Sequence, residues 1–234
     1  MNKLRWFLLV MLWFSGTVSA QERQQEIRKN MIIKFAPLAL FDTDNTFQAG
    51  IEVPVRNTKF SIQQDFGYGH ASFNIWYKDR DVRPDKTILK SRTQLRYYFY
   101  QKPALQMYVA GEYLYKRVIQ FDNQWVGVEC GSGGCNYFEN KDLKLGRLVN
   151  ALHAKLGWQF YFTNRITIDL FTGFGIRSRT LKILTPNVDQ ARFKDDFSFF
   201  TDNTPNSTLI LPSVAVGFNI GIILGKIKVL ERPE

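Results

Sequence analysis

The sequence predicts an all-β protein, built as an eight-stranded antiparallel up-and-down transmembrane β-barrel. Apolar and polar residues alternate with period two in eight segments of the chain, the pattern of strands with one apolar and one polar face. Short turns and longer polar loops alternate between these segments, as they do in outer-membrane barrels. The polar faces carry full charges and glycines, which is unusual for a solvated sheet and typical of a barrel lumen.

The clearest strands lie in residues 152–176. In the first of them, Leu152, Leu156 and Phe160 fall on one face, and the opposite face is polar. The second strand, from residue 166, alternates Ile, Leu and Phe with Thr, Asp and Gly. A tight turn is expected between them, so the segment is predicted to form a β-hairpin.

The other six strands are predicted from the same alternation. In the first, Pro37 interrupts the pattern, which predicts a bulge or an unpaired N–H position. Short turns follow strands two, four and six, and longer loops follow strands three, five and seven; an even strand count with this asymmetry is typical of membrane barrels. The predicted ranges are 31–41, 47–53, 60–68, 87–100, 105–121 and 209–224.

The first 20 residues have the pattern of a secretory signal peptide. Lys3 and Arg5 supply the positive start, an apolar core follows, and small residues ending at Ala20 supply the cleavage site. A single membrane anchor is disfavoured because the apolar run is too short to span a bilayer. We therefore predict export to the cell outer membrane. The predicted division is signal peptide 1–20, periplasmic tether 21–30, barrel 31–229 and C-terminal tail 230–234.

Aromatic residues gather at the ends of two strands that precede short turns. A girdle of rings at headgroup depth is the favoured interpretation, and the alternative is a packed aromatic core inside a soluble sandwich. The predicted girdle residues are Tyr97, Tyr98, Phe99, Tyr100, Trp158, Phe160, Tyr161 and Phe162.

Three stretches carry a family resemblance: NMIIKFAPLALFDTDNTFQAGIEVPV, SIQQDFGYG and LPSVAVGFNIGIIL. They resemble small eight-stranded outer-membrane β-barrel proteins of Gram-negative bacteria, and among these a family known as an outer-membrane barrel domain of unknown function. The resemblance implies outer-membrane lipids and the barrel insertion machinery as partners. Such barrels often end on an aromatic residue, whereas this chain continues to Glu234. The insertion signal is therefore absent or internal, for example at Phe218.

The charged residues on the polar faces are predicted to point into the lumen. Because an isolated buried charge is costly, they must pair with each other. A structural charge network is favoured over an ion or proton path, since side chains fill a barrel of eight strands. The predicted lumen residues are Lys34, Glu52, Asp65, Lys90, Arg92, Arg96, Glu112, Lys116, His153, Lys155, Asp169 and Arg177.

A basic external rim is also predicted. The formal net charge of +10 makes anionic partners plausible without selecting one. One hypothesis is that the rim contacts phosphates of lipopolysaccharide, and the other is a solvated rim with nearby acids. Nucleic acid is disfavoured because the signal peptide exports the chain. The rim residues are Arg117, Lys144, Arg147, Arg177, Arg179 and Lys182.

No catalytic residue, metal site or cofactor is predicted. Cys130 and Cys135 are expected to form a disulfide, as is usual for an exported protein. His70-Ala71-Ser72 is the only hint of a lipid-modifying enzyme, and this short motif lacks a nearby acid. His153 is expected to be a hydrogen-bonding lumen residue.

The preferred prediction is thus a monomer with a structural or surface-interaction role. The strongest rival fold is a soluble periplasmic lipocalin-like binding barrel, which would place apolar residues inside and polar residues outside.

Overall fold

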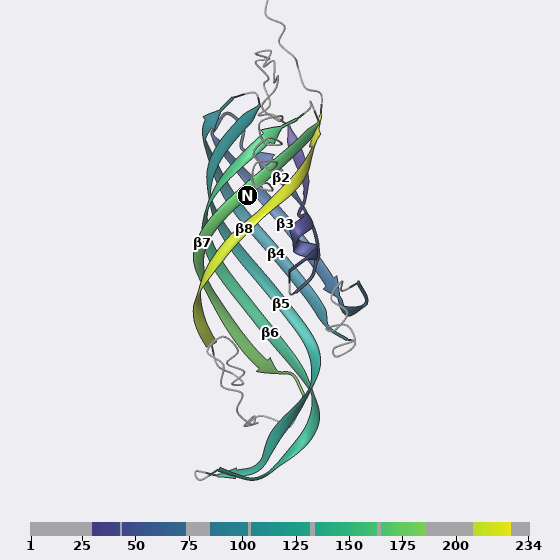
Figure 1. The fold of residues 1–234 in the computed structure, drawn as a ribbon. Helices are drawn as coiled ribbons and strands as arrows, with labels where there is room; N and C mark the ends of the chain where they lie inside the picture. The colour runs from purple at the N-terminus through teal and green to yellow at the C-terminus, as the bar shows by residue number, and fades with distance from the viewer. Residues whose placement is uncertain are drawn as a thin grey trace, which may run out of the picture.

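The structure, a computed structural model, describes residues 30–42, 44–73, 85–102, 104–131, 134–162, 165–185 and 208–225. Eight antiparallel strands follow one another in chain order and form a closed barrel (Figure 1). The signal peptide, the tether apart from Asn30 and the C-terminal tail lie outside the described residues, so the domain boundaries stay predictions. No helix in the described part of the chain is long and apolar enough to cross a membrane.

The up-and-down order and the all-β class are confirmed. The connections after β2, β4 and β6 lie at one end of the barrel, at the top of Figure 1, and the longer connections lie at the other end. The strands are β1 Met31–Phe35, β2 Phe47–Pro54, β3 Phe60–His70, β4 Thr87–Gln101, β5 Leu105–Gly131, β6 Gly134–Tyr161, β7 Ile166–Ile183 and β8 Thr208–Leu224.

The first strand is shorter than predicted. It ends at Phe35, and Pro37–Leu40 forms the 3₁₀ helix η2 instead, because proline lacks the N–H that would continue the ladder. The last ladder contact is Ala36 N–H donating to Gln48 O at 3.0 Å. As a result β1 pairs with β8 only through residues 220–224, and residues 208–219 of β8 have no strand partner on that side within the described chain.

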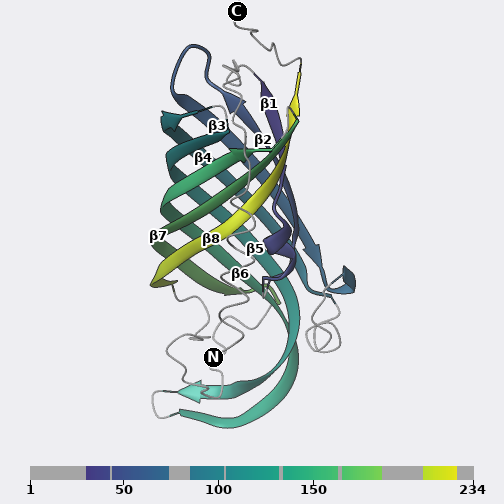
Figure 2. The same ribbon diagram turned by 45° about the horizontal axis from the view of Figure 1, so that its top comes forward.

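The longer loop predicted after strand five is instead a β-ribbon, formed by residues 122–131 and 134–144. Strands β5 and β6 continue pairing to Gly131 and Gly134, whereas β4 and β7 stop at the levels of Ile119 and Leu145. Figure 2 shows this ribbon, which we call the arm, curving away from the barrel. At ~3.3 Å per residue the arm is on the order of 40 Å long.

The barrel is apolar outside and polar inside. Every strand presents large apolar side chains on the outer wall, and Phe174 and Val214 are 74% and 75% exposed. The interior holds Arg96 and Asp169, both 0% exposed. This arrangement is opposite to that of a barrel folded in water, so the lipocalin-like alternative is wrong.

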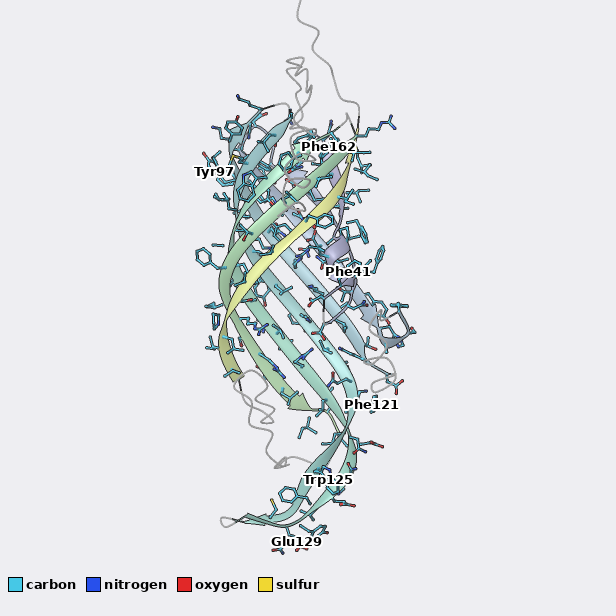
Figure 3. All side chains as sticks on the ribbon, in the orientation of Figure 1. Phe41, Tyr97, Phe121, Trp125, Glu129 and Phe162 are labelled. Atoms are coloured by element: carbon cyan, nitrogen blue, oxygen red, sulfur yellow. The ribbon has the colours of Figure 1, made fainter. Side chains whose placement is uncertain are left out.

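Aromatic side chains surround the end with the short turns. Tyr97 and Phe162 lie at this end in Figure 3, and the rings of Phe60 and Tyr97 are 5.1 Å apart. The girdle prediction is wrong for Tyr98, which is 5% exposed and points into the lumen. Because successive side chains point to opposite faces of a strand, consecutive aromatics cannot all join one girdle.

Candidate functional site

Four charged side chains form a plug in the lumen. Lys34 Nζ lies 2.5 Å from Glu52 Oε2 and 2.8 Å from Asp169 Oδ2. Arg96 Nη1 bridges the same two carboxylates, at 3.3 Å and 2.8 Å. Two cations thus face two anions, all of them buried, and neutral overall charge is what a buried cluster needs.

Two buried tyrosines complete the plug. The Tyr98 hydroxyl donates to Glu52 Oε1 at 2.5 Å, and the Tyr108 hydroxyl donates to Asp169 Oδ1 at 2.7 Å. The Arg96 guanidinium stacks on Tyr108, 4.2 Å from the ring centroid. A Cβ at Gly157 would lie 2.1 Å from this ring, so a glycine is required opposite Tyr108. All four charged residues were predicted to lie in the lumen, whereas neither tyrosine was.

A second polar layer lies next to the plug, toward the long-loop end. Arg92 Nη2 lies 3.2 Å from Asp65 Oδ2. Glu112 accepts a hydrogen bond from Gln94 at 2.9 Å and pairs with Lys155. The carboxylates of this layer are therefore held by cations and amides, as buried charges require.

The strand register aligns three chemically active residues across four neighbouring strands. Glu112 on β5 is opposite His153 on β6, which is opposite Gly175 on β7, which is opposite Ser213 on β8. His153 reaches across Gly175, where a Cβ would lie 2.8 Å from His153 Cα. His153 Nε2 lies 2.9 Å from Ser213 Oγ, and Nδ1 lies 3.2 Å from Glu112 Oε1. Ser213 was not among the predicted lumen residues.

These residues border a cavity of about 630 Å³ between the second polar layer and η2. Among its charged lining residues cations predominate, with six basic side chains and three carboxylates. The basic residues are Lys90, Arg92, Lys116, Arg147, Arg177 and Arg179, and the carboxylates are Asp42, Asp44 and Glu112.

Asp44 fixes the loop after η2 at the long-loop end of the barrel. Its carboxylate lies 3.1 Å from Lys86 Nζ and 2.5 Å from both Lys116 Nζ and Arg147 Nη2. Burial raises the pKa of Asp44, but the charges of Lys116, Arg147 and Lys86 outweigh it and hold the pKa well below its usual range. The carboxylate therefore stays ionised at neutral and mildly acidic pH. This contact was not predicted from the sequence.

The predicted basic rim divides into two groups. Arg147, Arg177 and Arg179 line the cavity, and Arg177 has no carboxylate partner among the described residues. Arg117 and Lys182 are exposed on positions that face outward, and Lys144 lies over the Phe121 ring at 5.5 Å. The rim prediction is thus wrong in treating all six residues as one surface.

The His70–Ser72 pair differs from the lumen cluster. His70 Nδ1 lies 2.8 Å from Ser72 Oγ and also accepts the Ser72 N–H at 3.2 Å. His70 is half-buried and Ser72 is exposed, and no carboxylate contacts His70 in the described chain. The pair forms a local turn at the start of η3, Ala71–Phe73.

The register places Cys130 opposite Cys135 at the tip of the arm, and the disulfide stays a prediction. Within the described ranges no group of three His, Cys, Asp or Glu side chains is arranged to hold a metal ion.

No protein-family model and no curated protein matches the chain. The resemblance to the outer-membrane barrel domain family therefore stays a hypothesis. Among solved structures, the chain is similar to the crystal structure of Neisserial surface protein A, with 10% sequence identity and a TM-score of 0.37. The match covers 82% of this chain and 94% of that chain. At this TM-score the similarity adds no functional argument.

Proposed function

We propose that this protein is a monomeric outer-membrane β-barrel with a closed lumen and a surface-interaction role at its long-loop end. The observation that carries the proposal is the reversed polarity of the barrel. Apolar side chains such as Phe66, Ile210 and Val216, which are 64%, 69% and 68% exposed, would be solvated in a water-soluble protein. A hydrocarbon environment removes that cost.

Folded outer-membrane barrels keep their structure in detergent until they are heated. We therefore expect the mature chain in the outer-membrane fraction, with different gel migration before and after boiling. Recovery in the water-soluble fraction, together with identical migration under both conditions, would exclude this proposal.

The surface-interaction role is proposed for the cavity. Its basic side chains outnumber its carboxylates, which favours an anionic ligand group. Phosphate groups of lipopolysaccharide have the required charge and are present at the external end of an outer-membrane barrel. Arg177 is the first candidate contact because its charge is not paired with a carboxylate in the described chain.

Retention on immobilised lipopolysaccharide tests this role. Replacing Arg177 and Arg179 together by alanine is expected to weaken retention at least several-fold at low salt, and high salt is expected to weaken retention of the unaltered protein. The matched control replaces Arg117 and Lys182 by alanine, which removes the same charge from outward positions. Equal losses in both double variants would contradict a specific role for the cavity.

A further inference from the structure

The cavity continues through the barrel wall. Its lining includes Ala215 and Gly217, which face inward on β8, and also Val214 and Val216, which face outward. These four residues belong to the part of β8 that has no β1 partner within the described chain. A cavity lined by both faces of an unpaired strand edge opens to the outer wall as well as to the mouth. Residues of both β8 and η2 line the cavity there, and Figure 1 shows η2 beside β8.

The opening has apolar borders and leads to a cationic interior. Leu38 and Phe41 line it on the η2 side and are 43% and 61% exposed; Figure 3 shows Phe41 on this side of the barrel. Val214 and Val216 line it on the β8 side. An anionic lipid matches this arrangement, because its acyl chain can stay in the hydrocarbon layer while its charged group enters the cavity.

Ser213 lies on the same unpaired part of β8, at the inner side of the opening. With Nδ1 facing Glu112 and Nε2 facing Ser213 Oγ, His153 has the orientation of the base in a serine–histidine–acid triad. The 3.2 Å contact between His153 Nδ1 and Glu112 Oε1 does not have the geometry of a hydrogen bond, and catalytic contacts are commonly poorly aligned in a free enzyme and tighten when substrate binds. Gln94 and Lys155 hold the other Glu112 oxygen, which fixes the carboxylate for this role.

The free edge of β8 also supplies a hydrogen-bond donor next to the serine. Ile223 N–H donates to Arg165 O on the β7 side, so odd-numbered β8 residues direct their backbone groups toward β7 and even-numbered ones toward the opening. Pro212 has no N–H to leave unpaired there. The Val214 N–H faces the opening and has no backbone partner in the described chain, so it is available to an oxyanion formed at Ser213.

We propose that Ser213, His153 and Glu112 form a hydrolytic site that cleaves an ester-linked acyl chain from an anionic lipid entering at the free edge of β8. Ser213 Oγ attacks the ester carbonyl carbon while its proton passes to His153 Nε2. The lipid alkoxide leaves with that proton, and the acyl group stays on Ser213. Water then attacks the acyl-enzyme with His153 as base, releasing a fatty acid and restoring the serine.

This proposal depends on the proposed function, that is, on an anion-binding cavity in a barrel that is inserted in the membrane. Ser213 and His153 touch the reacting atoms and are the catalytic residues. Glu112 is a positioning residue that holds His153. For Glu112→Gln we therefore expect a lower kcat with an unchanged KM, a separation that general loss of folding would not produce.

The test uses the full barrel, purified in detergent and reconstituted into vesicles. Fatty-acid release is measured by mass spectrometry from vesicles of phosphatidylglycerol and, separately, from lipopolysaccharide. Labelling of the protein by a small fluorophosphonate is followed by intact mass. Release and labelling are expected for the unaltered protein, and the lipid that reacts identifies the source. Ser213→Ala is expected to lower kcat/KM at least roughly 10³-fold and to abolish labelling.

Ser72→Ala is the matched control, since Ser72 also contacts a histidine but lies outside the cavity; this variant is expected to retain full activity. Hydrolysis that persists in Ser213→Ala would overturn the proposal. It would also be overturned if the unaltered protein neither releases fatty acid nor reacts with the fluorophosphonate while its Arg177-dependent retention on lipopolysaccharide is intact. If the unaltered protein also showed no retention on lipopolysaccharide, the proposed binding of anions by the cavity would be contradicted as well.

Discussion

Asp169→Asn is expected to lower the free energy of unfolding by about 3–5 kcal/mol, the range found when one partner of a buried ion pair is removed. Asp169 is fully buried and contacts Lys34, Arg96 and the Tyr108 hydroxyl. The neutral amide would leave two buried cations with only Glu52 as a counter-ion. Denaturant unfolding of the barrel in detergent micelles measures the loss.

Asp142→Asn provides the control. Asp142 is exposed on the arm and accepts a hydrogen bond from Asn123 at 2.8 Å, so its replacement is expected to have little effect. A double variant, Asp169→Asn with Lys34→Met, restores the charge balance and is expected to recover part of the stability. If Asp169→Asn were as stable as Asp142→Asn, the plug would contribute nothing to folding.

Phe174→Arg is expected to destabilise the barrel in lipid vesicles by about 2–4 kcal/mol, the cost of a cation near the bilayer midplane on a lipid-facing position. Phe174 lies midway along β7, is 74% exposed and pairs with the equally exposed Val214. In water the same substitution would be nearly neutral, because the side chain is already on the surface. Unfolding measured in vesicles therefore distinguishes a membrane-facing wall from a solvated one.

The control for this substitution is Tyr137→Arg. Tyr137 is 53% exposed but lies on the arm, outside the wall that would face lipid. A stability change at Tyr137 as large as that at Phe174 would argue against a bilayer around the barrel.

The alternation of residue types predicted which faces of the strands point inward. Lys34, Glu52, Arg96 and Asp169 lie inside, because each occupies one of the polar positions that alternate with apolar ones along its strand. The ends of the strands were harder to predict. The arm has polar residues on both faces, since most of its described side chains are exposed and only Val126 and Leu143 among them are buried. It therefore lacks the apolar–polar alternation that marks a half-buried strand. Pro37 was identified as an interruption, but the helix η2 that follows it was not.

The candidate site depends on register, which alternation does not specify between distant strands. Glu112 and His153 were predicted to lie in the lumen, but their alignment with Ser213 requires three successive strand pairings. Gly175 is essential to this alignment because it leaves space between His153 and Ser213. Asp44 was missed for a similar reason, since its partners Lys86, Lys116 and Arg147 come from distant parts of the chain.

The short contact between β1 and β8 has a consequence for the order in which the barrel assembles. The β5–β6 pair joins neighbouring segments through a long ladder, so little chain entropy is lost when it forms. The β1–β8 contact joins opposite ends of the described chain through only five residues of β1. Because distant contacts must first overcome the entropy of closing the intervening chain, we expect the β5–β6 hairpin to nucleate folding and the β1–β8 junction to form last and separate first.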